Sequence, residues 1–335
     1  MKKYLLPEKG HFYKANMHCH TYLSDGKLTP EEIKEAYVSE GYSIVAFTDH
    51  DILIPHPELA DDNFLPLNGC EIEVNENDDV EWREMKTCHI CCIAIEPDNF
   101  YQVCYNRTKY LYANAINQRS KLVVDESKPD FERLYSSEGI SAMMKEARES
   151  GFFVTYNHPT SSMEYYPDYM SYENMHALEI CNSGGVYNGH LDFCPNVYDD
   201  MLRGGKRIFC IAGDDTHSLN SAFGGFTMIK APKLEYKAVT DALLNGHFYA
   251  SQGPVIDELW IEDSVMHIKC QEAERIVFHP GLRRENKVFR SINGKGVTEG
   301  EYLVKPDHGY VRVTVYDKYG RAATTNAYFV DELLG

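Results

Sequence analysis

Short apolar runs alternate with helical patterns along about the first 250 residues of the chain. The runs are rich in β-branched or aromatic side chains and end at turn-forming or polar residues, which predicts buried strands. They cover residues 43–47, 65–74, 87–95, 152–156, 177–181 and 208–212. A capping box at 29–32, a one-sided apolar pattern after it and a stop at Gly41 predict a helix before the first of these runs. Strands that alternate with helices predict an α/β fold with a mostly parallel sheet.

Two segments depart from this alternation. Residues from about 98 to 150 predict a largely helical insertion, with a break near Pro129. From Gly253 onward, short alternating runs separated by turn residues predict a small antiparallel β module. We therefore expect a main domain over residues 1–252, which includes the insertion, and a second domain over residues 253–335.

The composition narrows the classes of function. With 335 residues, 43% of them hydrophobic, the chain is long enough to bury a large core. The formal net charge of −18 predicts an acidic surface that repels a nucleic-acid polymer. Apolar stretches stay shorter than the ~18 residues of a membrane-spanning helix, and no apolar signal segment follows the basic start. We expect a cytoplasmic protein without a membrane partner, and the sequence leaves its oligomeric state open.

The cysteines are open to two interpretations. The chain has 10 of them, without the regular spacing of a disulfide framework, and we expect reduced thiols. Cys88, Cys91 and Cys92 resemble a zinc-binding group, but they lie along the apolar run that ends near residue 95. We therefore favour small buried side chains of a strand over zinc ligands.

Histidines and carboxylates gather at the ends of the predicted strands. The candidate metal ligands are His18, His20, Asp25, His50, Glu71, His89, His158, Asp215 and His217. Imidazole and carboxylate together suit zinc, manganese or iron, and this set exceeds what one tetrahedral ion can use. Taken singly, His89 or His158 is more often a satisfied core histidine, and Glu71 is open to a salt bridge with an arginine. The whole set predicts a multinuclear metal site.

The motifs that carry these residues resemble the PHP family, named for polymerase and histidinol phosphatase. They are His18–Thr21 with Ser24–Gly26, Thr48–His50, Glu71, His89, Asn157–Pro159 and Asp215–His217. The resemblance covers roughly residues 11–250 and implies a distorted (β/α)7 TIM-like barrel with three divalent ions (Mn, Fe or Zn). More loosely, residues 246–254 and the β module after them resemble two-domain PHP proteins that include carbaryl-hydrolase-like enzymes.

The resemblance also implies how the ligands divide among the ions. The first ion is expected on His18, His20, Glu71 and Asp215. The second is expected on Glu71, His89 and His158, with Glu71 bridging, and the third on Asp25, His50 and His217. Because each of these positions holds a competent ligand, we expect an enzyme rather than a degenerate relative.

Clustered divalent ions activate water, so the chemistry expected is hydrolysis by a metal-bridging hydroxide. The first hypothesis is a metal-dependent phosphoesterase for a small phosphorylated metabolite, a phosphomonoester or nucleotide-like compound. The alternative is a carboxylester, carbamate or amide hydrolase that uses the same site. A non-catalytic, metal-stabilised binding module is a third hypothesis, and the intact ligand set argues against it.

Other candidate residues concern substrate and protons. Asp25 and His217 are candidates for protonating a leaving group, although a ligand role is favoured for both. Arg119 and Lys121 in the insertion are the cations expected to bind phosphate, and Asn182 after a strand is expected to line the pocket. Beyond these, Asp49 is open to two roles, orienting a ligand histidine or capping a turn, and Asp214 is expected to lie just outside the ligand set.

Overall fold

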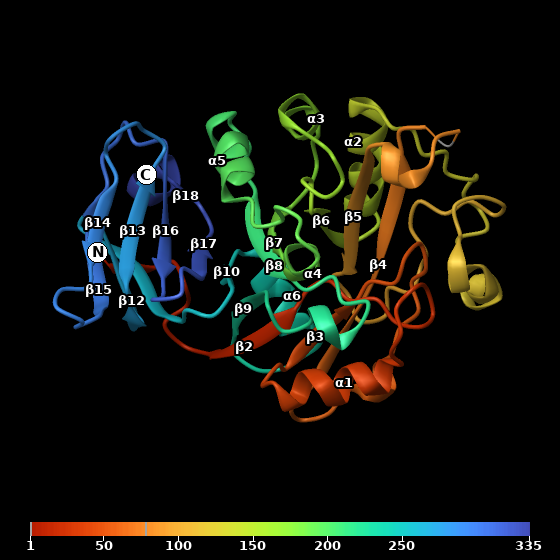
Figure 1. Ribbon diagram of the computed structural model, residues 1–335, viewed down its shortest axis with the longest axis horizontal. Coiled ribbons are helices and arrows are strands. Elements are labelled where there is room, and N and C mark those ends of the chain that lie inside the picture. Colours follow the sequence, from red (N-terminus) through yellow and green to blue (C-terminus); the bar gives the residue numbers. More distant parts are fainter. Residues whose placement is uncertain (1, 78) are drawn as a thin grey trace.

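The computed structural model describes residues 2–77 and 79–335, and its fold is mixed α/β with one large sheet (Figure 1). The sheet follows the order β14-β13-β16-β17-β10-β9-β2-β3-β4-β5-β6-β7-β8, with β18 paired to β16. The strands that position the candidate ligands are β2 (His11–Asn16), β3 (Ile44–Phe47), β4 (Leu65–Asn75), β5 (Thr87–Ala94), β6 (Phe152–Asn157), β7 (Ala177–Asn182) and β8 (Phe209–Gly213). They are followed by β9 (Phe226–Ala231) and β10 (Phe248–Ser251). The predicted α/β class is confirmed.

The sheet is less parallel than predicted. Strands β2, β3 and β4 are parallel, as are β6, β7 and β8, but β5 runs antiparallel to both of its neighbours. The reason is the short link between β4 and β5, whose described residues form a single 3₁₀ turn, η2 (Trp82–Glu84), whereas a parallel crossover needs a longer connection. Strand β9 is also antiparallel to β2 and β10.

The hydrogen-bonded path among the described residues is open at β8, so the closed barrel stays a prediction. Cys19 and Thr216, which lie just beyond β2 and β8, form an isolated parallel bridge. The two ends of the β2-to-β8 series therefore lie close together. This proximity is what brings the first and last ligand motifs to one place.

Most helices connect successive strands along the chain, and the last one follows the final strand. The helices are α1 (Pro30–Ser39), α2 (Ser137–Glu149), α3 (Tyr166–Ser171), α4 (Ser183–Tyr187), α5 (Pro195–Arg203), α6 (Tyr236–Leu244) and α7 (Val330–Leu334). Short 3₁₀ turns are η1 (Pro57–Leu59), η3 (Ala113–Lys121) and η4 (Leu219–Ser221). The predicted capping box at α1 is present: the Thr29 side chain accepts from the Glu32 amide, and Glu32 accepts from the Thr29 amide. None of the helices in the described ranges is long and apolar enough to cross a bilayer.

The segment from about 98 to 150 is much less helical than predicted. Helix α2 covers only its end, and η3 is a 3₁₀ helix within otherwise irregular chain. Polar side chains here bond to nearby backbone instead of leaving it free for a helix. The Asn106 carboxamide oxygen, for example, accepts from the amides of Thr108 and Lys109, both at 3.0 Å, and Asp125 accepts from the Ser127 amide.

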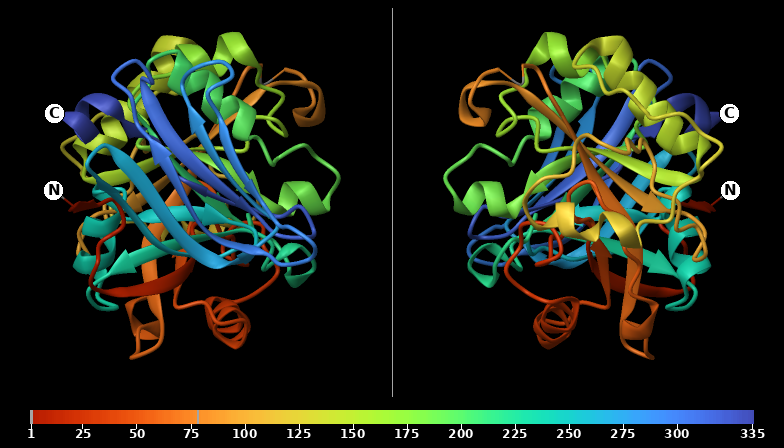
Figure 2. Two further views of the ribbon diagram at one scale, coloured as in Figure 1. Left: turned by 90° about the vertical axis from the view of Figure 1, so that its left-hand side faces the viewer. Right: turned by 90° about the vertical axis from the view of Figure 1, so that its right-hand side faces the viewer.

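All pairings recorded among the strands after residue 253 are antiparallel, as predicted. These strands are β11 (Ile256–Glu262), β12 (Val265–Ala273), β13 (Arg275–Pro280), β14 (Lys287–Arg290), β15 (Val297–Leu303), β16 (Tyr310–Tyr316), β17 (Ala322–Thr325) and β18 (Tyr328–Phe329). The N-terminal β1 (Lys2–Tyr4) joins β11, β12 and β15 in a four-stranded sheet, so both termini lie on the same side of the molecule (Figures 1 and 2). Strand β17 pairs with β10, so the large sheet continues through residue 253. The domain boundary there stays a prediction.

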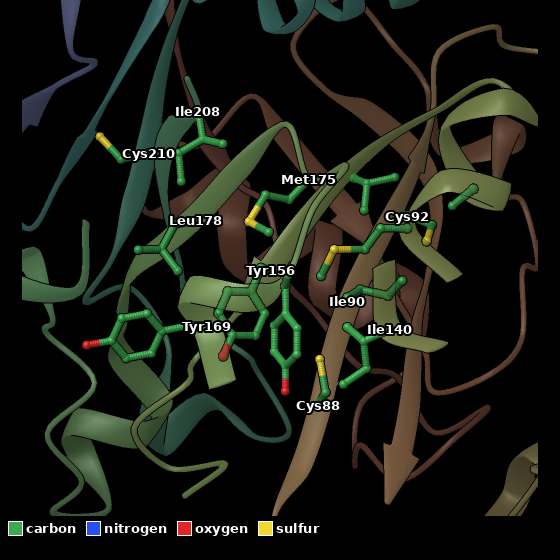
Figure 3. Close-up of a cluster of buried hydrophobic side chains, with 14 of the residues drawn as sticks. Cys88, Ile90, Cys92, Ile140, Tyr156, Tyr169, Met175, Leu178, Ile208 and Cys210 are labelled. Carbon is green, nitrogen blue, oxygen red and sulfur yellow. The ribbon is translucent and has the colours of Figure 1, made fainter. Parts of the chain in front are cut away.

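The largest apolar core packs β5–β8 against α2, α3 and α5 (Figure 3). Cys88, Ile90, Cys92, Ile140 and Tyr156 belong to it, and each is fully buried. All the cysteines are free and buried, which confirms the interpretation of Cys88 and Cys92 as small core side chains. Because this core holds the strands in register, the polar residues at their ends are held in fixed positions.

Candidate metal centre

The predicted ligands come from the ends of different strands and meet at one cavity. His18 and His20 follow β2, His50 follows β3 and His158 follows β6, while Glu71 and His89 lie within β4 and β5. Asp215 and His217 follow β8, and Asp25 lies in the loop before α1. The cavity has a volume of about 1480 Å³, and every predicted ligand except His18 and His20 lines it. His18 and His20 are completely buried beneath it.

Ligand atoms from these side chains form adjacent sets in which all atoms lie within 4.8 Å of one another. The sets are His18, His20, Glu71 and Asp215; His20, Asp25, His50 and His217; His50, Glu71 and His89; and His18, His158 and Glu179. The first set has the same members as the first ion implied by the family resemblance. The second contains all members of the implied third ion.

The implied second-ion set is also brought together. Glu71 Oε1 lies 3.0 Å from His89 Nδ1 and 3.2 Å from His158 Nε2. The other oxygen, Oε2, lies 3.2 Å from His20 Nε2 and 3.3 Å from His50 Nδ1. One carboxylate therefore faces several groups of imidazoles at once, which is the arrangement expected of a bridging ligand.

Several pKa values at the site are shifted, because acidic and basic side chains are buried close to one another. Burial alone would raise the pKa of Glu71, but facing imidazoles, led by His18 and His89, hold that pKa well below its usual range. The carboxylates in turn outweigh burial at His20 and raise its pKa to about 10. His50 behaves oppositely, because burial lowers its pKa to about 4. The site is therefore built around compensating charges.

Unpartnered buried atoms test whether these residues fit metal ions. His20 Nδ1, His50 Nδ1, His89 Nε2 and Asp215 Oδ1 are buried and make no well-aligned hydrogen bond, although a group of opposite charge type lies within 3.5 Å of each. Such atoms are costly in a protein interior unless something else satisfies them. Imidazole nitrogen and carboxylate oxygen are suitable donors for divalent cations such as zinc, manganese and iron. The residues present therefore fit a divalent metal site.

Glu179 is a member of the site that the sequence interpretation missed. It lies in β7, is fully buried, and its Oε1 is 3.1 Å from His18 Nδ1. A hydrogen bond between Glu179 and His18 Nδ1 orients the imidazole ring, whose other nitrogen, Nε2, lies 3.2 Å from Glu71 Oε1. Glu179 interrupts an apolar strand just as Glu71 does, so the cost of burying an unpaired carboxylate was a signal that could have identified it.

The two aspartates predicted near the ligands hold loops. Asp49 accepts from the Thr21 amide at 2.7 Å, from the Thr21 hydroxyl and from Ser24, which supports the turn-capping interpretation. Asp214 accepts from the Tyr37 hydroxyl at 2.8 Å and from the amides of residues 223–225. These bonds fix the segments on which His20, Asp25 and Asp215 stand.

The three residues predicted to bind substrate lie at different places relative to the cavity. Asn182 is not among the residues that line the cavity, but it donates to Oδ2 of the candidate ligand Asp215 at 3.1 Å. Arg119 and Lys121, however, are not among the residues that line the cavity, and the Arg119 guanidinium donates to the carbonyls of Asn106 and Arg107. Both residues lie in the 3₁₀ helix η3, and their predicted role in binding phosphate stays a prediction.

Other cations line the cavity, and carboxylates already engage them. Lys109 lies 2.7 Å from Glu132, and Arg83 lies 2.9 Å from Glu81. Arg133 is buried against Asp51 at 2.5 Å. Nothing in the sequence pattern pointed to these residues, because loops rather than strand ends bring them to the cavity.

Comparisons with known proteins agree with the motifs. The PHP domain matches residues 16–213, a span that ends just before Asp215 and His217. No curated protein matches the chain significantly. A two-domain protein containing a predicted PHP-like metal-dependent phosphoesterase, from Bacteroides vulgatus, is 14% identical over 97% of this chain and 98% of that one, with a TM-score of 0.44. An amidohydrolase from Chromobacterium violaceum, solved with sulfate and no metal, is 16% identical over 61% of this chain and 88% of that one, with a TM-score of 0.38.

These structural similarities are too weak to carry an argument. The PHP domain match, in contrast, spans more than half of the chain. The matched span includes the motifs of His18, His20, His50, Glu71 and His158. On that match, the chain belongs to the PHP domain family.

Proposed function

We propose that this protein is a metal-dependent phosphoesterase that hydrolyses a small phosphorylated metabolite, with three divalent ions bound. The observation that carries the proposal is the convergence of imidazoles and carboxylates in adjacent sets around Glu71 at the cavity. Adjacent cations suit a phosphate group, because they activate water and neutralise charge on the phosphate oxygens as it reacts. Manganese, iron and zinc all fit the donor set.

The chain's own residues hold and orient this centre. In the proposed assignment, His18, His20, Glu71 and Asp215 hold one ion, while Glu71 also serves a second ion with His89 and His158. Asp25 and His217 lie 3.2 Å apart and share a donor set with His50, which favours ligand roles for both over the acid role considered from the sequence. The protonation of the leaving group then falls to another residue.

A carboxylester, carbamate or amide hydrolase is the second candidate, and one observation favours it. The lysine and arginine side chains described as lining the cavity are engaged by carboxylates, so none of them is free to pair with phosphate. A neutral substrate needs no such cation. The cavity, at about 1480 Å³, exceeds the roughly 300–1,000 Å³ of ordinary ligand pockets and accommodates either substrate class.

A matched pair of substrates separates the two candidates. Manganese-loaded protein is assayed with p-nitrophenyl phosphate and p-nitrophenyl acetate, which release the same phenol. We expect a higher kcat/KM for the phosphate, and a clear preference for the acetate would support the second candidate instead. Glu71→Gln serves as the control in both assays, because loss of the central carboxylate should abolish any activity that belongs to this site rather than to a contaminant.

A further inference from the structure

A consecutive run of exposed residues, 186–191, lies at the metal cavity, and we call it the 186–191 loop. It begins in α4 and ends before the buried Asp192. Tyr187, Asn188 and His190 from this loop line the cavity together with the predicted ligands. The loop is therefore exposed to solvent on one side and faces the cavity with part of its side chains.

Both ends of the loop are tied to the segments that carry metal ligands. At the start, the Asn182 carboxamide accepts from the Gly185 amide at 2.8 Å and donates to Asp215 Oδ2 at 3.1 Å. At the end, Asp192 Oδ1 accepts from the Ser161 amide at 2.9 Å, in the turn that follows His158. The Asp192 carbonyl also accepts from the Asn182 amide, which closes the loop. Hydrogen bonds of the residues that flank the loop therefore hold it in place next to the candidate metal centre.

Most ionisable groups around the cavity already have a partner. Asp25, Glu71, Asp215 and their histidines belong to the donor sets. Glu73 lies 3.2 Å from His89, and the cations Arg83, Lys109 and Arg133 are each paired with a carboxylate. Of the histidine, acidic and basic side chains described as lining the cavity, His190 alone lies outside the donor sets and has no recorded hydrogen bond or ion pair. Its backbone amide is bonded, to the Gly185 carbonyl at 2.9 Å, so the residue is held while its ring is free.

We propose that His190 is the general acid that protonates the leaving-group oxygen. This inference rests on the proposed phosphoesterase function and names the residue that the ligand roles of Asp25 and His217 leave missing. Histidine is the side chain that most often acts as a general acid or base in enzymes. A residue that serves as a metal ligand through the same nitrogen cannot also deliver a proton from it.

The step balances in atoms and charge. A water oxygen forms the new bond to phosphorus, and the bond from phosphorus to the leaving-group oxygen breaks with its electron pair on that oxygen. The leaving oxygen takes the proton from the His190 imidazolium and departs as the alcohol or phenol. The proton lost by the attacking water passes to solvent, and the neutral imidazole takes one proton back from solvent, so one water is consumed in each turnover.

The test compares leaving groups, because a general acid matters only where the leaving oxygen needs a proton. His190→Ala is assayed with phenyl phosphate, a poor leaving group, and with p-nitrophenyl phosphate, a good one. We expect kcat/KM to fall about 100-fold for phenyl phosphate, in the range of general acid catalysis, and less than about threefold for p-nitrophenyl phosphate. Leu191→Ala, at a 78% exposed position of the same loop that does not line the cavity, should leave both values unchanged.

Two further readouts separate proton donation from structural damage. The metal content of His190→Ala should equal that of the wild type, and its Kd for the non-hydrolysable benzylphosphonate should stay within about twofold, because the proton moves only in the transition state. Equal losses for both phosphates, or no loss for either, would overturn the role of His190 while leaving the phosphoesterase proposal intact. A wild-type enzyme that hydrolyses neither phosphate would overturn the proposed function, and this step with it.

Discussion

Glu164 offers a test of how burial and hydrogen bonding compete in this fold. Its carboxylate is buried, and it accepts hydrogen bonds from the hydroxyls of Tyr135 (2.9 Å), Tyr156 and Tyr172. Burial disfavours the charged form and raises the pKa of Glu164 from 4.5 to about 7, although the tyrosine hydroxyls act in the opposite direction. Glu164→Gln keeps the shape of the neutral acid and removes the titration.

The sign and size of the effect follow from this shift. Below about pH 4.5 the folded and unfolded states both hold the proton, and the group contributes nothing to the pH dependence of stability. As the pH rises from 4.5 to about 7, the unfolded chain releases the proton while the folded protein retains it, so the wild type loses stability. Between pH 5 and pH 8 this loss amounts to about 2 to 3 kcal/mol for Glu164.

The assay is urea unfolding of metal-free protein at several pH values from 5 to 8. We expect the free energy of unfolding of Glu164→Gln, relative to wild type, to increase by about 2 to 3 kcal/mol over this range. Glu301→Gln, at an exposed position of β15, should track the wild type throughout. Parallel curves for Glu164→Gln and wild type would refute the reasoning, because they would mean that the tyrosine hydroxyls fully offset the effect of burial.

Three further predictions concern the metal centre and the C-terminal strands. Glu71→Gln should lower metal content at two sites together, measured by elemental analysis, because its two oxygens face different groups of imidazoles. Gly213→Ala should weaken metal binding about tenfold in a chelator competition, because the added Cβ would lie 2.9 Å from both His18 Cβ and Glu179 Oε1. Arg312→Ala should cost about 3 kcal/mol in urea unfolding, because the buried guanidinium pairs with both carboxylate oxygens of Asp199 at 2.7 Å and its loss leaves that charge with only the more distant Arg203, at 3.9 Å.

The candidate ligands were predictable because strand ends are local features of a sequence. Each motif follows or lies within an apolar run, and the carboxyl ends of neighbouring parallel strands share one edge of a sheet. His50 after β3 and His158 after β6 illustrate the rule. Glu71 and Glu179 show the same signal in another form, a carboxylate inside an apolar strand, and the sequence interpretation used it for only one of them.

The direction of β5 was not predictable from its own residues. An apolar run of this kind is equally suited to a parallel or an antiparallel neighbour, and the length of the connection decides between them. The link between β4 and β5 is short, and its described part holds a 3₁₀ turn instead of the α-helix usual in a parallel crossover. His89 in β5 still reaches Glu71 in β4. In the antiparallel register Glu71 pairs with Cys91 and His89 pairs with Glu73, so Glu71 and His89 are diagonal neighbours on adjacent strands.

The cationic side chains near the cavity could not be placed from a local sequence pattern in this way. Arg119 and Lys121 lie in the 3₁₀ helix η3, but most of the insertion is irregular chain, whose path is set by tertiary contacts rather than by a local sequence pattern. The buried pair of Arg133 with Asp51, for example, ties that segment to the residue that follows the candidate ligand His50. Residues that irregular segments bring to the cavity, such as Lys109 and His190, are therefore visible only in the folded structure. The difference has a physical cause. Regular strands carry the proposed metal ligands at positions that the sequence encodes locally, whereas other side chains that line the cavity, such as Lys109 and His190, lie on loops whose paths the whole fold determines.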